Sequence, residues 1–485
     1  MARMMKRRAF LQTAATGCAL GLATPALLAA ARSARAPGLI SPGCRRSKVR
    51  VAKLYLGRPK AHWPTPKMDL KAEVQAYEAR LSRMDELSDV DFVVNELVTS
   101  PDQLQAVKGK LTDVDGVLAI HLSMGIRGML NDLVSIGRPT VLFAAPYSGH
   151  EWTRFGALQK REGGSMLECM LTSDYSQLAV GVRPFRAIHH LREAKILNVT
   201  KRQLPAQYVA SVRERLGTEI KRIEREQVLA AYDAVADEDA QAEARRWIAR
   251  ATKVVEPSKE EVVKSCKLAL ALERLLEDED ATVMTVDCYG TMWRQLPAYP
   301  CIGFTRLNDM GLGGICESDL QSAMTHIILQ GLSGRPGFVN DPTMDVSTDS
   351  IILAHCLGST RMDGPDKKAA PYKLRCIMER QEGAVAQVKM RRGERATTAR
   401  LIGTDLLLYF TGTILDAPDL DRGCRTKITV QVDGDAEVLW QNWSHGLHRV
   451  TCYGDLAEDL RRFCKFAQIA MVDEAAPAPA EEATA

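Results

Sequence analysis

Short apolar runs alternate with helical patterns in the first part of the chain. Between the later runs, the segments SPDQLQAVKGKL and IRGMLNDLVSIG repeat apolar residues at the spacing of an α-helix. Strands that alternate with helices are typical of a parallel sheet, so this pattern predicts an α/β domain over residues 48–180. The runs that we expect to form its strands lie at 49–56, 90–97, 116–121 and 139–146. No GxGxxG motif follows the first run, so a dinucleotide site is not indicated.

A second region repeats this α/β pattern. It opens with the apolar run AKILNVT, continues through long helical patterns over 207–252 and reaches another strand pattern at 281–288. Ser258 and Glu261 have the S-x-x-E spacing of a capping box, which predicts that a helix begins there. We therefore expect a second parallel α/β domain over residues 181–345.

The pattern changes after about residue 385 to short strand-like segments. AVAQVKM, ATTARLIG, LLLYFTGTIL and RTKITVQVDG favour strands, and turn residues separate them. We expect a mostly β domain over 346–472, and the low-complexity end EAAPAPAEEATA predicts disorder over 473–485. The predicted fold class is α/β, with two parallel, Rossmann-like α/β domains followed by a mostly β C-terminal domain.

The N-terminus has the features of an export signal. Arg7 and Arg8 stand one spacer residue before Phe10 and Leu11, and a weakly apolar, alanine-rich stretch follows. This arrangement resembles the core of a twin-arginine signal. The alternative is a membrane anchor, but the stretch is short and is diluted by Gly, Thr and Pro. We expect residues 1–36 to be a twin-arginine signal peptide that sends the folded protein to the periplasm or the extracellular space.

The charge balance depends on this leader. The chain has 485 residues, 46% hydrophobic and 26% charged, which is ordinary for a globular protein, and its net charge is +4. Removing residues 1–36 subtracts six positive charges and no negative ones, so the remainder carries −2. A nucleic-acid-binding role thereby loses its main support, and we expect no membrane association after signal removal. The six basic residues are Arg3, Lys6, Arg7, Arg8, Arg32 and Arg35.

The twelve cysteines have the spacing of neither a disulfide framework nor a zinc knuckle. Eleven follow the leader, an odd number without a C-x-x-C pair, and several lie in apolar runs such as VMTVDCYG and VVKSCKLAL. We expect most of them to be buried thiols. Twin-arginine export carries folded proteins, often because a cofactor is inserted beforehand. An exported chain with unpaired cysteines is therefore consistent with a bound metal.

Two carboxylates bracket a helical pattern in the stretch GGICESDLQSAMTHIILQGLSGRPGFVNDP, residues 313–342. Ser318 and Gln321 have capping-box spacing, so we expect the helix to begin just after Glu317. The apolar stripe of this helix consists of Leu320, Ala323, Met324, Ile327, Ile328 and Leu332, and Gly331, Gly334 and Pro336 end it.

The helix and the chain that returns from it have nearly equal expected lengths. About 14 helical residues advance ~21 Å, and an extended return from Arg335 to Asp341 covers ~23 Å. If the chain doubles back, Asp341 returns close to Glu317 at the start of the helix. The alternative is that Glu317 only complements the helix dipole and that Asp341 only starts a turn before Pro342.

Two carboxylates that meet at one edge of an α/β sheet repel each other unless a cation or a shared proton lies between them. Hard divalent cations such as Mn²⁺ or Mg²⁺ favour oxygen-rich sites of this kind. A nearby imidazole shifts the preference toward Mn²⁺. The acid pair therefore predicts a divalent cation site.

Three of the nine histidines are candidate partners for these acids. His445 and His448 lie in the glycine-containing loop WSHGLHRVTCYGD, which packing alone does not readily explain. His355 follows an apolar run in IILAHCLGS, where a core histidine is the alternative reading. Four further histidines have no comparable partners in the sequence, so we expect structural roles for His121, His150, His189 and His190.

The two segments that hold these residues resemble a known family. GICESDLQSAMTHIILQGLSGRPGFVND is similar to the segment of L-fucose isomerase and L-arabinose isomerase relatives in which a Glu after a glycine-containing turn and a later acid bind the catalytic metal. The ending HRVTCYGDLAEDLRRFCKFAQI resembles their C-terminal HH…GD…L region. Two α/β domains followed by a β-rich domain match the fucose isomerase architecture, and the 24-residue spacing of the acids agrees best with that side of the family.

The resemblance implies that Glu317 and Asp341 are both metal ligands and the proton-transferring acids, and that His448 is the imidazole ligand. His355 falls where the arabinose isomerase side has another histidine ligand. His445 is a rival to His448, because this chain has His-Arg where relatives have paired histidines. The implied cofactor is Mn²⁺ or another divalent cation such as Mg²⁺. The implied reaction interconverts the aldose and ketose forms of a pentose or 6-deoxyhexose through an enediol, in a homo-oligomer.

Two other functions are compatible with the sequence. An exported sugar-binding protein would also have two α/β domains around a cleft, but it would need neither the acid pair nor the third domain. A metal-dependent carbohydrate hydrolase without isomerase activity would also act on exported carbohydrate. Metal content and an assay for ketose formation separate the three functions.

Overall fold

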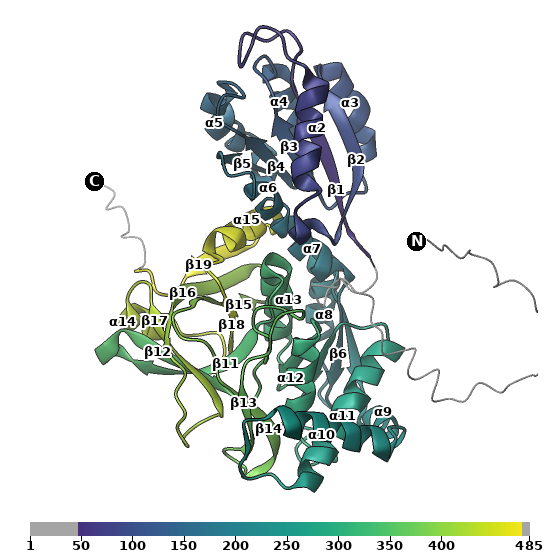
Figure 1. Cartoon of the computed structure of the whole chain (residues 1–485), viewed down its shortest axis with the longest axis vertical. Helices are drawn as coiled ribbons and strands as arrows, with labels where there is room; N and C mark the ends of the chain where they lie inside the picture. Colours follow the sequence, from purple (N-terminus) through teal and green to yellow (C-terminus); the bar gives the residue numbers. More distant parts are fainter. Residues whose placement is uncertain (1–46, 478–485) are drawn as a thin grey trace, which may run out of the picture. The chain divides into compact units, whose positions relative to one another are not determined.

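The computed structural model describes residues 47–477 (Figure 1). All of these residues belong to one compact unit. The signal peptide expected over 1–36 lies outside the described residues and stays a prediction. Within the described part, no helix combines the length and the apolar character needed to cross a membrane.

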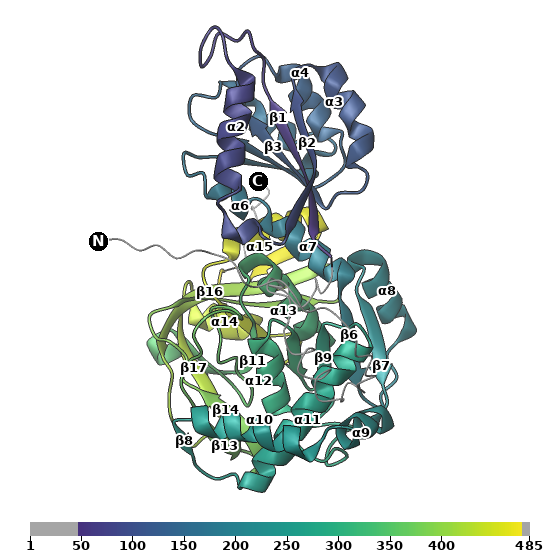
Figure 2. The ribbon, with the colours of Figure 1, turned by 45° about the vertical axis from the view of Figure 1, so that its right-hand side comes forward.

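Five parallel strands make the first sheet, in the order β2-β1-β3-β4-β5. Side chains alternate along each strand, so that Tyr55 of β1 belongs to one core and Leu54 to the other. Helices cover both faces of the sheet, with α2 on one and α3 and α4 on the other (Figure 2). The α/β prediction is confirmed here, although β5 was not expected. The strands are β1 (Val49–Leu56), β2 (Val90–Val98), β3 (Gly116–His121), β4 (Thr140–Ala144) and β5 (Leu167–Leu171), and the helices are α2 (Leu70–Leu81), α3 (Pro101–Lys108), α4 (Arg127–Val134), α5 (Phe155–Gln159), α6 (Gln177–Val180) and α7 (Arg183–Glu193).

A second parallel sheet has the strand order β10-β9-β6-β7. Ser258 caps helix α11 through its hydroxyl, which accepts from the backbone N–H of Glu261 at 3.2 Å, as the sequence predicts. The region 207–252 is not helical throughout, because β7 interrupts it. The strands are β6 (Lys195–Val199), β7 (Glu219–Ile223), β9 (Val283–Val286) and β10 (Gly313–Cys316), and the helices are α8 (Ala206–Leu216), α9 (Arg225–Asp233), α10 (Asp237–Arg250), α11 (Lys259–Asp278), α12 (Cys301–Asp309) and α13 (Leu320–Ser333).

The last part of the described chain is mostly β, as predicted. Six antiparallel strands close into a barrel in the order β15-β18-β11-β12-β17-β16, because β16 also pairs with β15. Strand β19 extends the sheet from β16, and β8, β13 and β14 form a small separate sheet. The strands are β8 (Lys253–Val254), β11 (Phe338–Asp345), β12 (Ser350–His355), β13 (Tyr372–Ile377), β14 (Glu382–Val388), β15 (Arg395–Ile402), β16 (Leu406–Asp416), β17 (Thr426–Val432), β18 (Arg449–Tyr453) and β19 (Ala470–Asp473), with helices α14 (Ala436–Asn442) and α15 (Ala457–Ala467).

Two boundaries differ from the expected ones. Strand β11, which lies before the expected boundary at 345, pairs with β12 and β18 and is therefore part of the barrel. The predicted disorder is wrong for 473–477: Glu474 is buried, and its carboxylate pairs with the guanidinium of the equally buried Arg449 at 2.6 Å. A low-complexity composition hides this buried ion pair. Residues 478–485 lie outside the described part.

Helix α13 lies between the second parallel sheet and the barrel, and one hydrophobic core joins the three (Figure 1). The expected apolar stripe is only part of its buried surface, because polar residues such as Ser322 and Gln330 are also buried. The helix is capped by Asp319, whose carboxylate accepts from the N–H of Ser322 at 3.0 Å, so the predicted capping box at Ser318 is wrong. Gly334 ends the helix with φ +70°.

A glycine makes the close approach between β10 and α12 possible. A Cβ placed on Gly314 would lie 2.4 Å from Phe304 Cα and 2.6 Å from its carbonyl oxygen. Because both are backbone atoms, we expect Gly314→Ala to lower the free energy of unfolding by roughly 1–3 kcal/mol or more, measured by urea denaturation. Gly109→Ala is the control, since its added Cβ meets no atom within 4 Å. Equal midpoints for the two variants would contradict the close packing.

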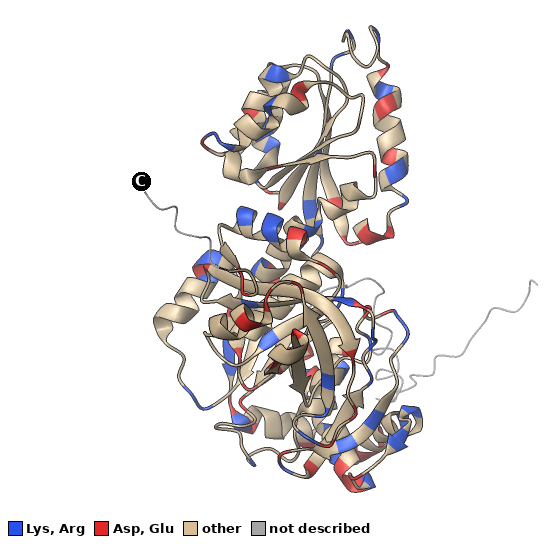
Figure 3. Ribbon diagram, turned by 90° about the vertical axis from the view of Figure 1, so that its left-hand side faces the viewer, with Lys and Arg blue, Asp and Glu red and all other residues tan. Residues whose placement is uncertain are grey.

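Acidic and basic residues are interspersed along the described ribbon (Figure 3). On α15, the side-chain nitrogens of Arg461 and Lys465 lie 2.6 and 2.8 Å from the carboxylate of Glu168 in β5. On α7, the guanidinium of Arg186 pairs with the carboxylate of Asp89 at 2.8 Å. These basic side chains are thus neutralised within the chain.

Candidate metal centre

The chain makes a strained turn where β10 ends. Glu317 and Ser318 have φ values of +62° and +59°, a left-handed conformation that costs about 1–3 kcal/mol per residue other than glycine. The turn is held by the backbone N–H of Ser318, which donates to Val286 O at 3.2 Å, and by its hydroxyl, which donates to Asn198 Oδ1 at 2.7 Å. The structure therefore fixes Glu317 at the carboxyl edge of the second parallel sheet, where α/β proteins commonly bind ligands.

The chain returns from α13 and brings Asp341 to the same place. In β11, Asp341 pairs with Ala354 of β12, one residue before His355. Nε2 of His448 lies 3.3 Å from Asp341 Oδ1 and 3.7 Å from Glu317 Oε2. The two acids that are 24 residues apart in sequence thus face one imidazole.

A second histidine lies beside the first. Nε2 of His355 is 3.9 Å from Glu317 Oε1, and the rings of His355 and His448 are 5.5 Å apart at an angle of 60°. The Nδ1 atom of His355 accepts from the backbone N–H of Cys356 at 2.9 Å, so its ring has a fixed orientation. His355 is thus buried, as a core histidine would be, and also lies at the acid pair.

Among the residues that the structure describes, three buried polar atoms at this point find no partner with hydrogen-bond geometry: Asp341 Oδ1, His355 Nε2 and His448 Nε2. Buried polar atoms are nearly always paired, so three unpaired ones side by side call for a further group between them. Ligand atoms of these three residues all lie within 4.8 Å of one another. Two imidazoles and carboxylate oxygens are a suitable ligand set for Mn²⁺, so the residues present fit a divalent cation.

Asp319 orients the ligand histidine. Its Oδ2 atom lies 3.0 Å from Nδ1 of His448, which leaves Nε2 directed to the acids. Arg400 holds the same carboxylate at 2.8 Å and donates to the backbone carbonyl of His448 at 3.0 Å. A carboxylate behind a metal-binding histidine is a recurrent arrangement. Sequence reasoning missed Asp319, although the E-S-D order in GICESD places it two residues after Glu317.

The surroundings push the pKa values of the two acids apart. Burial raises the pKa of Glu317, and the neighbouring Asp341 adds to this effect while His448 opposes it. Burial alone would also raise the pKa of Asp341, but the nearby imidazoles of His448 and His355 outweigh it and lower the pKa. Carboxylates with divided pKa values are suited to separate acid and base roles.

The two histidines also differ. Burial lowers the pKa of His355 to about 4, which keeps the imidazole neutral and available as a ligand. Burial also opposes a charge on His448, but its contacts with Asp319 and Asp341 prevail and raise its pKa to about 10. Without a bound cation, a proton on His448 balances part of the negative charge of the surrounding carboxylates. A bound divalent cation would balance this charge instead.

The remaining histidines lie elsewhere. His445 is exposed. Its contact with the site is made by its backbone carbonyl, which accepts a hydrogen bond from Arg400 Nε at 2.9 Å. Two of the histidines for which structural roles are expected have acidic partners. Nε2 of His121 lies 3.5 Å from Glu151 Oε2, and Nδ1 of His189 lies 2.8 Å from Asp115 Oδ2.

Comparison with known proteins gives a weak similarity to sugar isomerases. No protein-family profile matches the chain. It is 29% identical over 168 residues to the sulfoquinovose isomerase of Clostridium sp. (strain MSTE9), which covers 33% of this chain and 37% of that protein. It is 21% identical over 210 residues to the sulfoquinovose isomerase of Alkalicoccus urumqiensis, covering 42% and 46%. The chain thus matches less than half the length of either relative.

Proposed function

We propose that this chain is a metal-dependent aldose–ketose isomerase. The observation that carries the proposal is the meeting of Glu317 and Asp341 at Nε2 of His448, where this nitrogen, Asp341 Oδ1 and His355 Nε2 are buried without hydrogen-bond partners among the described residues. The similarity to two proteins named sulfoquinovose isomerase supports the same reaction class. The cation proposed is Mn²⁺, with Mg²⁺ as the alternative.

The ligands proposed for this cation are Glu317, Asp341 and His448, with His355 as the fourth. When bound, a divalent cation polarises neighbouring hydroxyl and carbonyl oxygens and stabilises negative charge on them. Asp319 and Arg400 hold His448 in place. One carboxylate of the acid pair takes the proton from one of the two sugar carbons C1 and C2 and returns it to the other. The second carboxylate transfers protons to and from the sugar oxygens. The difference in pKa makes Asp341 the more readily ionised and Glu317 the more readily protonated of the two.

The substrate class proposed is a pentose or a 6-deoxyhexose. The two relatives are named sulfoquinovose isomerase, so sulfoquinovose belongs in the panel of sugars that tests this proposal. We further propose that residues 1–36 export the folded protein by the twin-arginine route, and that it assembles as a homo-oligomer.

The proposed chemistry predicts exchange with solvent. We expect the Mn²⁺-loaded protein, incubated in D₂O with a panel of pentoses, 6-deoxyhexoses and sulfoquinovose, to form a ketose that carries deuterium at C1 or C2. A carboxylic acid in a wet cleft trades its proton with water, whereas a hydride shift retains the original hydrogen. NMR and mass spectrometry of the products measure this. Sugar binding without turnover would favour the binding-protein alternative, release of a smaller sugar would favour the hydrolase, and full retention of hydrogen would overturn the proton-transfer role.

A further inference from the structure

A second group of metal-ligating side chains lies next to the acid pair. Cys356, Glu379 and Cys424 each offer one ligand atom, and these atoms all lie within 4.8 Å of one another. Cys424 Sγ is 3.2 Å from Glu379 Oε1. Cys356 directly follows His355 at the end of β12, whereas Glu379 lies between β13 and β14 and Cys424 shortly before β17. Three separate segments of the chain therefore meet at this point.

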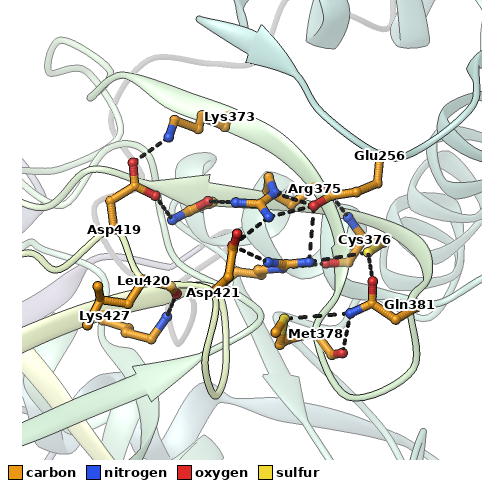
Figure 4. Close-up of polar contacts among 12 residues, drawn as sticks. Glu256, Lys373, Arg375, Cys376, Met378, Gln381, Asp419, Leu420, Asp421 and Lys427 are labelled. Carbon is orange, nitrogen blue, oxygen red and sulfur yellow. Dashed lines mark hydrogen bonds and ion pairs between the residues drawn. The ribbon is translucent and has the colours of Figure 1, made fainter.

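The segments that carry Cys424 and Glu379 are anchored by a network of charged and polar side chains (Figure 4). The buried guanidinium of Arg425 donates to the backbone carbonyl of Cys376 at 2.8 Å and to Asp421 at 3.0 Å. Arg375 binds the same Asp421 at 2.7 Å and also Glu256 at 2.8 Å. These bonds tie the loop that ends at Cys424 to strand β13.

The turn that holds Glu379 is anchored as well. The side-chain amide of Gln381 donates to the backbone carbonyl of Met378 at 2.7 Å (Figure 4). The backbone N–H of Gln381 donates to the carbonyl of Ile377 at 2.8 Å. Gln381 has φ +54°, a conformation that a residue other than glycine adopts only when its surroundings impose it. The second ligand group is thus built on fixed segments, as a preorganised site requires.

We propose that Cys356, Cys424 and Glu379 form a second cation site that takes Zn²⁺ or another thiophilic divalent ion. Two thiolates and a carboxylate are ligands that Zn²⁺ prefers, and with Zn–S bonds of ~2.3 Å the two sulfurs of a tetrahedral site lie about 3.7 Å apart. Glu379 is exposed, so the fourth position opens to water.

This site is chemically distinct from the first one. The acid pair and its histidines offer oxygen and nitrogen, whereas the second group offers sulfur, so the two select different metals. They are nevertheless neighbours, because Cys424 Sγ lies 3.9 Å from Asp341 Oδ2. A cation held by the thiolates would act on the charge of Asp341 near its Oδ2 atom, whereas His448 faces Oδ1. The inference goes beyond the proposed isomerase activity and does not depend on it.

Cobalt titration tests the second site. We expect the chelator-treated, reduced full-length protein to bind Co²⁺ with a near-ultraviolet sulfur-to-cobalt charge-transfer band, and Zn²⁺ to abolish this band stoichiometrically. Cys356→Ser and Cys424→Ser should each weaken or remove the band. Cys169→Ser is the matched control: Cys169 is half-buried like Cys424 but lies in β5 of the first sheet, so the variant should keep the full band.

A variant that leaves both thiols in place keeps the test informative if a cysteine variant fails to fold. Glu379 is exposed, so Glu379→Gln should fold normally. We expect it to keep the band but to bind Co²⁺ more weakly, by at least the ~10–100-fold typical of a lost metal-supporting group. Absence of the band in the reduced wild-type protein, its persistence in both cysteine variants, or a Cys356–Cys424 disulfide in the protein as isolated would overturn the proposal. The band reports thiolate ligands whether or not any sugar is isomerised.

Discussion

We expect Glu317→Gln to lower the rate of isomerisation by at least ~10²-fold, because the change keeps the volume of the side chain but removes a group that can carry a proton. The fold should survive, since the oxygen of the amide can still occupy the position of Oε2 near His448. Turnover of the best sugar of the panel, measured with saturating Mn²⁺, gives the effect on kcat. Asp341→Asn should lower kcat similarly and also weaken metal binding, since its Oδ1 atom is one of the unpaired buried atoms.

The control for this experiment is Glu437→Gln. Glu437 lies on α14, is exposed, and accepts from Gln441 at 3.1 Å, a contact that a glutamine side chain can still make. Its activity should equal that of the wild type. A Glu317→Gln protein with normal kcat would show that this carboxylate does not move a proton, and the catalytic role proposed for Glu317 would be wrong.

Where a strand is a largely apolar run, the sequence predicts its first and last residues to within two positions. The runs 49–56 and 116–121 coincide with β1 and β3, because both strands are buried on both faces of a parallel sheet. Strand β7 was missed for the opposite reason. Its EIKRI sequence is only partly buried at the edge of the second sheet, so it lacks the apolar run that marks the other strands.

The cap of α13 shows what local patterns cannot decide. Ser318 and Asp319 are both good capping residues, and the sequence favours Ser318 because Gln321 follows at the right distance. The structure uses Ser318 in a left-handed turn, where its hydroxyl donates to Asn198, a residue 120 positions away. The cap then falls to Asp319. A contact between distant segments decides which residue caps the helix, and rules based on sequence spacing take no account of such contacts.

Chain lengths alone predict that the two acids meet. They do not predict which residues hold the histidine between them in place. Equal lengths of helix and return path indicate that Asp341 comes back to Glu317, whatever sheet receives it. The histidine that joins them, His448, directly precedes β18, and its orientation depends on Asp319, the N-cap of α13, and on Arg400 of β15. Likewise, Glu379 and Cys424 meet Cys356 only because the small sheet docks beside the barrel. Such convergence is a property of the tertiary fold.

The second large effect is expected at a residue that touches neither sugar nor cation. Asp319→Asn keeps the cap of α13, since Asn caps helices as well as Asp does, but it removes the negative charge that faces His448 and Arg400. The neutral amide makes a weaker hydrogen bond to Nδ1 and no longer increases the basicity of the imidazole. We expect the affinity for Mn²⁺ to fall by roughly 10–100-fold, as is typical for loss of a carboxylate behind a metal-binding histidine. Isothermal titration calorimetry of the chelator-treated protein measures it.

Asp435→Asn provides a matched control for this change. Asp435 caps α14 by accepting from the N–H groups of Glu437 and Val438, at 2.8 and 3.2 Å, and it is exposed. Both variants therefore replace an N-cap aspartate by asparagine, and both should unfold at nearly the wild-type urea concentration. Only the variant at Asp319 should lose Mn²⁺ affinity, because only there does the carboxylate also hold an imidazole. If both variants lost affinity equally, or if neither did, Asp319 would be a structural cap alone, and the orientation of His448 would have to be ascribed to its burial and to Arg400.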